Sequence, residues 1–447
     1  MPFMSAKADT LLGAIGQHPE QPLVIHRDEQ LTPSRLCSAA GEIKAAHPEL
    51  ASASIALQFS NTRELLVNLL ALDGYAGEIL LLPPCLSGDR LTDLVSTVGS
   101  AYLLNENGVS ALAPEQEQHS GDDATAWLFT TSGTTGPPKV YSHTLNSLTA
   151  TTRPPRVSAR EYRWGLAYQA HRFAGMQVVL QALLSGNTLV VPPSTDLPAM
   201  VETFVEHRVN TLSATPSQWR NFLIHGAIRG CSLEQITLGG EIADQAILST
   251  LRREFPAARI VHIYASTEAG VGFSVTDGRA GFPAAWLGQG PPCEMKISDT
   301  GSLLIRSPAM SRSGETLHAR LTPEGYLDTE DRVAVSDGRV HFLGRATGII
   351  NVGGNKVHPE EIENLVRAIP GVQNALASGR GSPIMGQLVV LEVQAGELSA
   401  EESSAFVRRI RDHCRQNLPK HKVPALINIV RELAVSESGK VERRQTG

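Results

Sequence analysis

The residue types that point most clearly to chemistry lie together at 128–139, in the run LFTTSGTTGPPK. Five hydroxyl residues and two glycines follow an apolar lead-in, and the run ends at Lys139. Glycines let backbone N–H groups approach anionic oxygens, hydroxyl groups donate further hydrogen bonds, and the lysine adds positive charge. The run is not a Walker A loop, because Lys139 lies between Pro138 and Val140 where that loop needs Gly-Lys-Ser/Thr. It predicts a phosphate-binding loop, with a polar surface loop as the plainer alternative.

Further segments rich in glycine, hydroxyl and charged residues follow along the chain. They are 171–175 (HRFAG), 238–241 (LGGE), 263–268 (IYASTE), 325–331 (GYLDTED), 344–345 (GR), 350–356 (INVGGNK), 359–363 (PEEIE), 418–424 (LPKHKVP) and 438–444 (SGKVERR). Together with the phosphate-loop run they resemble, in order, the motifs of the adenylate-forming (AMP-binding) enzymes. This superfamily includes acyl- and aryl-CoA synthetases, nonribosomal peptide adenylation domains and luciferases. The resemblance covers about residues 120–447.

The resemblance implies three catalytic residues, which would act on ATP and Mg²⁺. Thr267 is expected to donate to the α-phosphate and Glu268 to hold the metal. One carboxylate suffices for a hard cation when substrate phosphates supply the remaining oxygens. Lys440 is expected to bridge carboxylate and phosphate oxygens as negative charge builds in the transition state. A solvated lysine near a basic C-terminus is the plainer alternative for Lys440.

The resemblance also implies the residues that surround the nucleotide. Tyr264 is expected to flank the adenine, and Asp331 to accept hydrogen bonds from both ribose hydroxyls, because a carboxylate is an acceptor that can take two donors. Arg345 is expected to reach the ribose or the phosphates. The remaining ATP and AMP contacts are expected from Thr131, Ser132, Gly133, Thr134, Thr135, Gly136, Lys139, Gly240 and Glu241.

Several positions depart from the family pattern. Ala265 replaces the usual glycine beside Tyr264, His262 stands where asparagine is common, and Glu330 replaces the glycine of the Thr-Gly-Asp motif. The hinge position after Arg345 usually holds Asp or Lys, but here residues 346–348 are Ala-Thr-Gly. Small residues can absorb a large backbone rotation, so a hinge at or beside Thr347 remains compatible with the sequence.

The expected acyl pocket contains His171, Phe173, Ala174, Gly175, Gly239 and Ala265. Taken alone, His171 is more commonly explained as a core histidine. The resemblance implies that members acting on amino acids carry an acidic residue in this segment to pair with the substrate ammonium. Residues 171–175 include no carboxylate, which disfavours an α-amino acid. These residues predict a narrow, flat and mostly apolar slot for an aryl acid such as a hydroxybenzoate or hydroxycinnamate. A medium-chain or β-hydroxy acyl acid is the alternative.

The implied reaction has two halves, formation of an acyl-adenylate and transfer of the acyl group to a thiol. Gly353, Gly354, Asn355 and Lys356 are expected on the thiol side after the C-terminal domain rotates. The acceptor is coenzyme A or the phosphopantetheine of a separate acyl carrier protein. A luciferase-like oxygenase and a catalytically degenerate nucleotide or acyl binder are alternatives from other functional classes.

The elements that must position these residues follow an α/β pattern. Apolar strands at 54–59, 78–82 and 187–191 alternate with helices at 63–72 and 197–207, which is typical of parallel sheets with crossover helices. Short alternating segments separated by turns then predict a β subdomain at about 290–343. We expect an N-terminal adenylation body over 1–343, built of layered α/β sheets plus this subdomain, and a small mobile α+β lid domain over 344–447. The lid is expected to contain helices at 359–368 and 400–416 and strands at 387–393 and 426–430.

Composition limits the class of protein. With 447 residues, 42% hydrophobic and 19% charged, the chain has an ordinary globular composition. A net charge of −6 favours neither nucleic acid nor a membrane surface as partner. We find no membrane-spanning run and no secretory signal in the sequence. The five scattered cysteines favour neither a disulfide framework nor a zinc site, so a cytoplasmic protein is expected. The resemblance implies that its partner is a small carboxylic acid.

Overall fold

The computed structural model of the chain describes residues 10–112, 124–131, 139–152, 161–289, 293–314, 317–345, 348–382 and 386–434. Its largest sheet has eight strands in the order β14 (Gly270–Val275), β13 (Arg259–Ser266), β12 (Gln235–Leu238), β11 (Thr211–Ala214), β9 (Arg163–Leu166), β10 (Thr188–Val191), β1 (Val24–His26) and β2 (Glu29–Leu31). The strands from β13 to β1 are parallel, and antiparallel β14 and β2 form the edges. All four residues of β10 are buried, as predicted for a parallel strand covered on both faces.

A second sheet has six strands in the order β6 (Gly108–Ala111), β5 (Tyr102–Asn105), β3 (Ser54–Gln58), β4 (Glu78–Leu81), β7 (Ala126–Thr131) and β8 (Lys139–His143). Its centre is again parallel, and β6 and β8 pair antiparallel at the edges. The predicted strands at 54–59 and 78–82 are β3 and β4. The phosphate-loop run leaves this sheet at the end of β7 and re-enters it at Lys139 in β8.

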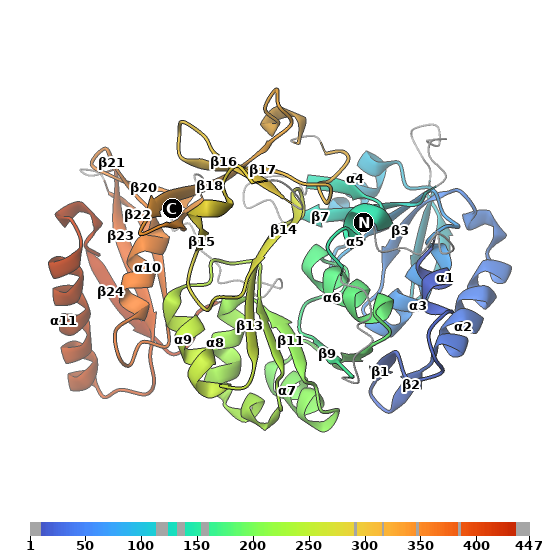
Figure 1. Ribbon diagram of the computed structural model, residues 1–447, viewed down its shortest axis with the longest axis horizontal. Coiled ribbons are helices and arrows are strands. Elements are labelled where there is room, and N and C mark those ends of the chain that lie inside the picture. The colour runs from blue at the N-terminus through green and yellow to red at the C-terminus, as the bar shows by residue number, and fades with distance from the viewer. Residues whose placement is uncertain are drawn as a thin grey trace.

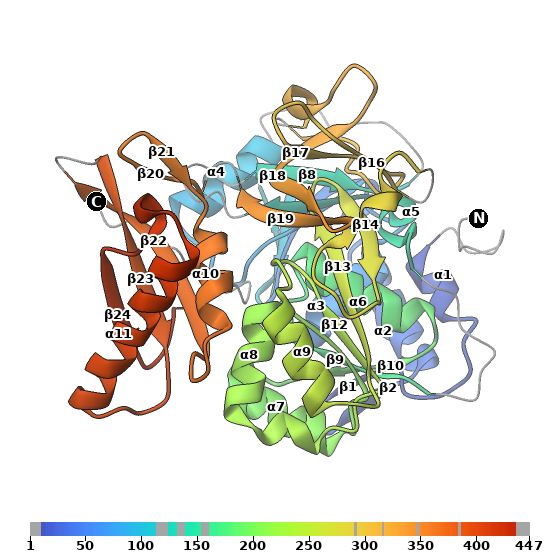
Figure 2. The ribbon, with the colours of Figure 1, turned by 60° about the vertical axis from the view of Figure 1, so that its left-hand side comes forward.

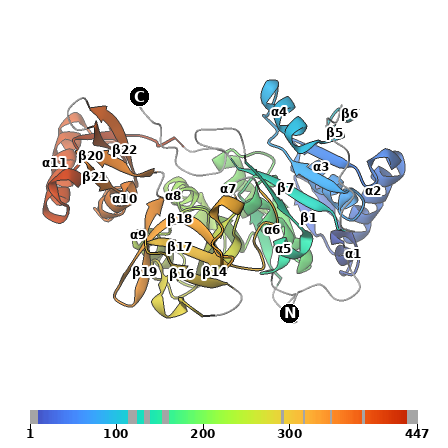
Figure 3. The ribbon, with the colours of Figure 1, turned by 90° about the horizontal axis from the view of Figure 1, so that it is seen from above.

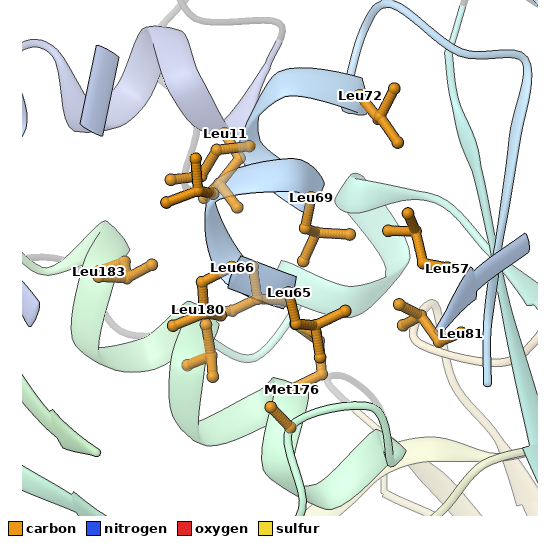
Figure 4. Close-up of a cluster of buried hydrophobic side chains, with 14 of the residues drawn as sticks. Leu11, Leu57, Leu65, Leu66, Leu69, Leu72, Leu81, Met176, Leu180 and Leu183 are labelled. Atoms are coloured by element: carbon orange, nitrogen blue, oxygen red, sulfur yellow. The ribbon is translucent and has the colours of Figure 1, made fainter. Parts of the chain in front are cut away.

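Helices α3 (Thr62–Leu72) and α6 (Phe173–Leu184) form the core of the body together with α1 (Leu11–Ile15). Asn61 caps α3 by accepting a hydrogen bond from the Arg63 amide, and most residues of both helices are buried. Figure 4 shows Leu65 and Leu69 of α3 near Met176 of α6 and Leu57 of β3. Replacing one such leucine by alanine costs about 2–5 kcal/mol of stability.

The other helices of the body lie around these sheets. They are α2 (Pro33–Ala46), α4 (Asp89–Val98), α5 (Leu145–Thr149), α7 (Leu197–Glu206), α8 (Pro216–His225) and α9 (Gln245–Glu254). Figures 1 and 2 show α7, α8 and α9 gathered beside β11, β12 and β13. No helix in the described ranges is both long and apolar enough to cross a bilayer.

The predicted β subdomain is an antiparallel sheet in the order β15 (Phe282–Pro283), β19 (Arg339–Arg345), β18 (Leu327–Ser336), β17 (Ser302–Arg306) and β16 (Glu294–Ile297). The sheet begins slightly before residue 290 and continues to Arg345, two residues beyond the expected end. A register shift in β18 where it pairs with β17 leaves Glu330 in the left-handed region, with φ +62°.

The C-terminal domain follows β19. Its sheet contains β21 (Asn355–Val357), β20 (Ile350–Val352), β23 (Gly386–Gln394), β22 (Asn374–Ser382) and β24 (Leu426–Val430), with β24 parallel to β23. Helices α10 (Pro359–Arg367) and α11 (Ala400–Asn417) pack against it. Figure 3 shows this domain at one end of the molecule, with α11 on the outside. The helices predicted from Pro359 and Ala400 and the strand at 426–430 are all present.

Candidate active site

A cavity of 2640 Å³ lies where the two α/β sheets, the antiparallel sheet and the C-terminal domain meet. It contains most of the predicted site residues that the structure describes. These are Thr131, Lys139, Phe173, Ala174, Gly239, Gly240, Glu241, Tyr264, Ala265, Thr267, Glu268, Asp331 and Arg345. They come from six separate motifs of the sequence, so the fold brings the motifs to one place. Ser132, Gly133, Thr134, Thr135, Gly136, Thr347 and Lys440 lie outside the described residues.

Thr267 and Glu268 form the turn between β13 and β14, and hydrogen bonds to their backbone hold this turn in place. Nε2 of His143, in β8, donates to the Thr267 carbonyl at 2.7 Å, and the Ser311 amide donates to the Glu268 carbonyl at 2.9 Å. Burial lowers the pKa of His143, so its ring is neutral near pH 7. The turn of one sheet is thereby tied to the phosphate-loop strand of the other.

The Glu268 carboxylate is 12% exposed and pairs with Arg320, whose Nη1 lies 3.3 Å from its Oε1. Burial acts to raise the pKa of Glu268. A backbone hydrogen bond and the cations of Arg345 and Arg320 outweigh burial, and the pKa falls below its ordinary value. Glu268 is therefore ionised at neutral pH. Arg320 also approaches Glu330, with Nη1 3.8 Å from Oε2. We call Glu268, Arg320 and Glu330 the active-site ion cluster.

Glu268 could serve as a ligand of Mg²⁺ that is bound together with substrate phosphates. It could not by itself hold a metal ion whose ligands all come from the protein. Among the described residues, no three His, Cys, Asp or Glu side chains gather as a metal site. Mg²⁺ usually binds one or two carboxylates and takes its other oxygens from water and substrate phosphates. An ionised, partly buried carboxylate that faces the cavity beside Thr267 meets this requirement.

Tyr264 and Asp331 contact each other directly. The Tyr264 hydroxyl donates to Asp331 Oδ2 at 2.5 Å, and Arg345 Nε donates to Asp331 Oδ1 at 3.1 Å. Burial and this carboxylate raise the pKa of Tyr264, so the phenol stays protonated. The Tyr264 ring is stacked with Phe273 and with Phe342, each with its centroid 5.3 Å away. These ring contacts and the hydrogen bond to Asp331 fix the orientation of Tyr264 at the cavity wall.

Two predicted pocket residues do not line the cavity. His171 is 5% exposed, and its Nε2 has no hydrogen-bond partner among the described residues. Burial, with the charge of Arg172, lowers its pKa to about 3. A Cβ on Gly175 would lie 2.1 Å from the Gln169 carbonyl oxygen, so this glycine permits α6 to pack closely. His171 is the core histidine that its sequence alone suggested, and Gly175 serves packing.

The part of the cavity lined by α6, β11 and β12, where the acyl group is expected, has more polar lining than the predicted mostly apolar slot. Helix α6 is buried except along Ala174, Gln177 and Gln181, which share one face of the helix and line the cavity. Ser213 of β11 and Thr237 of β12 line the same cavity. Aromatic lining comes from Trp164, Tyr168 and Phe173. This end can therefore accept a flat ring that carries a polar group.

The predicted thiol-side residues are turned away from the cavity. Gly353 and Gly354, with φ +57° and +83°, form the two-residue turn between β20 and β21. Together with Asn355 and Lys356, they do not line the cavity, whereas residues of α10 and β22 do. In this arrangement the C-terminal domain presents α10 to the body (Figure 2).

A buried group of charges joins the two domains. Arg367 of α10 lies 3.6 Å from Asp244, the residue that caps α9, and Asp244 also pairs with Arg220 of α8. Arg367 in addition pairs with Glu363 at 3.1 Å and donates to the Ala375 carbonyl at 2.8 Å. We call Arg220, Asp244, Glu363 and Arg367 the interdomain ion cluster.

Sequence reasoning missed His143, Arg320 and the interdomain ion cluster. His143 and Arg320 lie 124 and 52 residues from their partners Thr267 and Glu268. The sequence signal that could have pointed to the active-site ion cluster was Glu330, which stands where the family motif has glycine.

Comparisons with known proteins agree with this architecture. The family model described as AMP-binding enzyme matches residues 87–313, and the model of its C-terminal domain matches residues 361–440. The 2-succinylbenzoate–CoA ligase of Bacillus subtilis is 25% identical over 96% of this chain and 95% of its own length. The o-succinylbenzoate CoA synthetase structure from the same organism, in complex with an acyl-adenylate, has a TM-score of 0.73 at 21% identity and covers 96% of each chain. An anthranilate CoA ligase in complex with anthranoyl-AMP has a TM-score of 0.79 at 16% identity, covering 99% of this chain and 96% of its own.

Proposed function

The chain belongs to the AMP-binding enzyme family, and we propose that it is an acid–thiol ligase that activates an aromatic carboxylic acid with ATP and transfers the acyl group to coenzyme A. The observation that carries this proposal is the meeting of Thr267, Glu268, Asp331 and Arg345 at one cavity, beside the ends of the phosphate-loop run. The CoA ligases among the relatives support the same reaction.

In the first half-reaction a carboxylate oxygen attacks the α-phosphorus of ATP, and pyrophosphate leaves. The protein's task is to align the reactants and to stabilise charge, with little covalent chemistry of its own. Thr267 donates to the α-phosphate, and Lys440 bridges the carboxylate and phosphate oxygens. Asp331 accepts from the ribose after its bonds with Tyr264 and Arg345 rearrange. Mg²⁺ held by Glu268 would offset the negative charge of the phosphates.

In the second half-reaction a thiolate attacks the acyl carbonyl, and AMP leaves as the thioester forms. Gly353 and Gly354 lie outside the cavity in this arrangement. The proposal therefore requires rotation of the C-terminal domain about the segment after Arg345, which would bring the β20–β21 turn to the acyl-adenylate. A phosphopantetheinyl carrier protein is the alternative acceptor.

An aromatic acid with a polar substituent fits the acyl side of the cavity best. Trp164, Tyr168 and Phe173 supply flat apolar contact, while Gln177 and Gln181 supply hydrogen-bonding groups along one face of α6. Relatives named for succinylbenzoate and anthranilate support an aromatic acid. The polar face of α6 also suits a β-hydroxy acyl acid, which is the second candidate.

The first test is pyrophosphate release with ATP and Mg²⁺ across benzoates, cinnamates, fatty acids and amino acids. Hydroxylamine is included to trap adenylates. We expect substituted aromatic acids to give the highest kcat/KM, and addition of coenzyme A to give the thioester. Preference for a fatty or β-hydroxy acid would overturn the aromatic assignment. Silence across the panel, from protein that still binds ATP, would favour a catalytically degenerate binder.

The matched variants are Lys440→Ala and Lys420→Ala. Loss of Lys440 removes a charge-stabilising group, so the adenylation rate should fall by about two or more orders of magnitude. Lys420 lies in the C-terminal domain outside the cavity and should tolerate the same change. Equal rates for the two variants would contradict the assigned role of Lys440.

A further inference from the structure

Glu330 has an unfavourable backbone conformation at the edge of the active site. Its φ of +62° lies in the left-handed region, which costs an L-residue about 1–2 kcal/mol and which glycine adopts readily. Its side chain is 48% exposed and lines the cavity. Strained non-glycine residues cluster at functional sites, where the strain accompanies a role. The side chain of Glu330 is therefore the place to look for that role.

Arg320 lies between two carboxylates and is fixed in position by the backbone. Its Nε donates to the Asp328 carbonyl at 2.9 Å. Its Nη1 lies 3.3 Å from Glu268 Oε1 and 3.8 Å from Glu330 Oε2. Glu268 is its hydrogen-bonded partner, and Glu330 is near enough to become one after a small side-chain movement.

A divalent cation and Arg320 cannot both use Glu268 equally well. Both are positive, and two like charges a few ångströms apart in a partly buried site repel strongly. The Glu268 carboxylate needs a positive partner when the cavity holds no metal, because an unpaired buried charge is costly. The same partner must withdraw when a metal binds. Glu330 offers Arg320 a second carboxylate at that moment.

We propose that Arg320 is the resident counter-ion of Glu268 and that Glu330 receives Arg320 when Glu268 binds a divalent cation. This inference rests on the proposed function, because it takes Glu268 as the metal-binding carboxylate. Arg320 and Glu330 are positioning residues in this scheme, since they act through Glu268. The strain at Glu330 persists because a glycine there would leave Arg320 without its second partner.

The test titrates the full chain into Mn²⁺–ATP and measures binding from the enhancement of the water-proton relaxation rate, which distinguishes Mn²⁺ held at the protein from Mn²⁺ held by ATP alone in solution. We expect Glu330→Gln to weaken Mn²⁺ binding by about 3- to 5-fold, the effect of removing a half-exposed partner. Arg320→Gln should tighten binding by about 10-fold, because the competitor for Glu268 is gone. The double variant should behave as Arg320→Gln alone, since Glu330 acts only through Arg320.

Two further variants separate charge from strain. Glu330→Gly removes both the carboxylate and the left-handed strain, and it should weaken Mn²⁺ binding as much as Glu330→Gln does. Asp337→Asn is the matched control, because Asp337 is an exposed acid with φ +50° in the turn between β18 and β19 and outside the cavity. It should leave Mn²⁺ binding unchanged.

Three results would each overturn the inference while leaving the proposed function intact. The first is unchanged Mn²⁺ binding in both Glu330 variants. The second is weaker binding in Arg320→Gln, which would assign Arg320 to the phosphates instead. The third is additive effects in the double variant. The proposed function itself fails on a different observation, namely wild-type protein with neither ATP-dependent Mn²⁺ binding nor pyrophosphate release.

Discussion

The two ion clusters of this chain are built from the same residue types and behave differently. In the interdomain ion cluster, Arg367 donates to Glu363, Asn364, Asn374 and Ala375 and also lies against Asp244. In the active-site ion cluster, Arg320 hydrogen-bonds to one carboxylate and stands within 4 Å of another. An arginine whose side-chain nitrogens all donate hydrogen bonds, such as Arg367, keeps one side-chain position. An arginine with two competing carboxylate acceptors, such as Arg320, can change partner.

Burial explains the difference. Asp244 and Glu363 are 6% and 3% exposed, so any charge left unpaired there would be severely destabilising. Each half of the interdomain ion cluster is also paired within its own domain, Arg220 with Asp244 and Arg367 with Glu363. The contact between domains can therefore separate without leaving a lone buried charge. Glu330, at 48% exposure, can gain or lose its partner at little cost.

The largest effect on stability is expected from Arg367→Ala. Removing this arginine breaks its ion pair with the buried carboxylate of Glu363, and the free energy of unfolding should fall by about 3–5 kcal/mol. Urea denaturation measures this change. Arg415→Ala is the control, because its pair with Asp412 is about two-thirds exposed and should contribute at most about 1 kcal/mol. If Arg367→Ala lowered the free energy of unfolding no more than Arg415→Ala does, the buried ion pair would contribute no more to stability than the exposed one, and the comparison would fail.

A smaller, pH-dependent effect is expected at His171, a buried titratable group in neither cluster. Its pKa is about 3 in the folded chain against an ordinary value of 6.5, so between these values the unfolded state binds an extra proton. Stability should therefore fall as pH drops below 6.5, with a slope of up to about 1.4 kcal/mol per pH unit from this group.

The variant His171→Gln removes this proton uptake by the unfolded state. Between pH 7 and pH 5, the free energy of unfolding should therefore decrease less for the variant than for the wild type. Urea denaturation at several pH values checks the difference. Parallel pH profiles for the two proteins would show that the histidine is protonated in the fold and has a partner there.

The smallest effect is expected from Glu330→Gly. Relief of the left-handed strain should raise the free energy of unfolding by about 1 kcal/mol, while the metal affinity falls. Asp337→Gly relieves strain at a comparable φ and should gain less, because aspartate tolerates this conformation better than glutamate. Thermal unfolding compares the two. A stability loss in Glu330→Gly would mean that the ion pair with Arg320 outweighs the strain.

The sequence was most informative where short-range pattern decides structure. The apolar run at β10 and the helix starts at Pro359 and Ala400 were predicted because buried apolar runs, and proline or acidic residues in a first helical turn, are local signals. Strand β22 was not predicted, because residues 374–382 (NALASGRGS) contain no β-branched residue. Its pairing with β23 over nine residues stabilises the extended conformation that its own residues do not favour.

The site divides in the same way. Thr267, Glu268 and Asp331 could be named because their motifs are contiguous, and they line one cavity. The hydrogen bonds that position Thr267 and Glu268 could not be predicted, because His143 and Arg320 come from distant parts of the chain. The stacking of Phe342 on Tyr264 was also invisible, since it depends on how the antiparallel sheet meets β13.

The hydrogen bond from His143 to the Thr267 carbonyl has a mechanical consequence. His143 belongs to the six-stranded sheet and Thr267 to the turn of the eight-stranded sheet, and Ser311 binds both the Ser142 and the Glu268 carbonyls. The seam between the sheets and the turn at Thr267 and Glu268 are thus one cooperative unit of opening. The Ser311 amide donates across this seam, so it should exchange with solvent hydrogen only when the turn and the seam open together. Opening of the turn at Thr267 and Glu268 is thus coupled to opening between the two sheets.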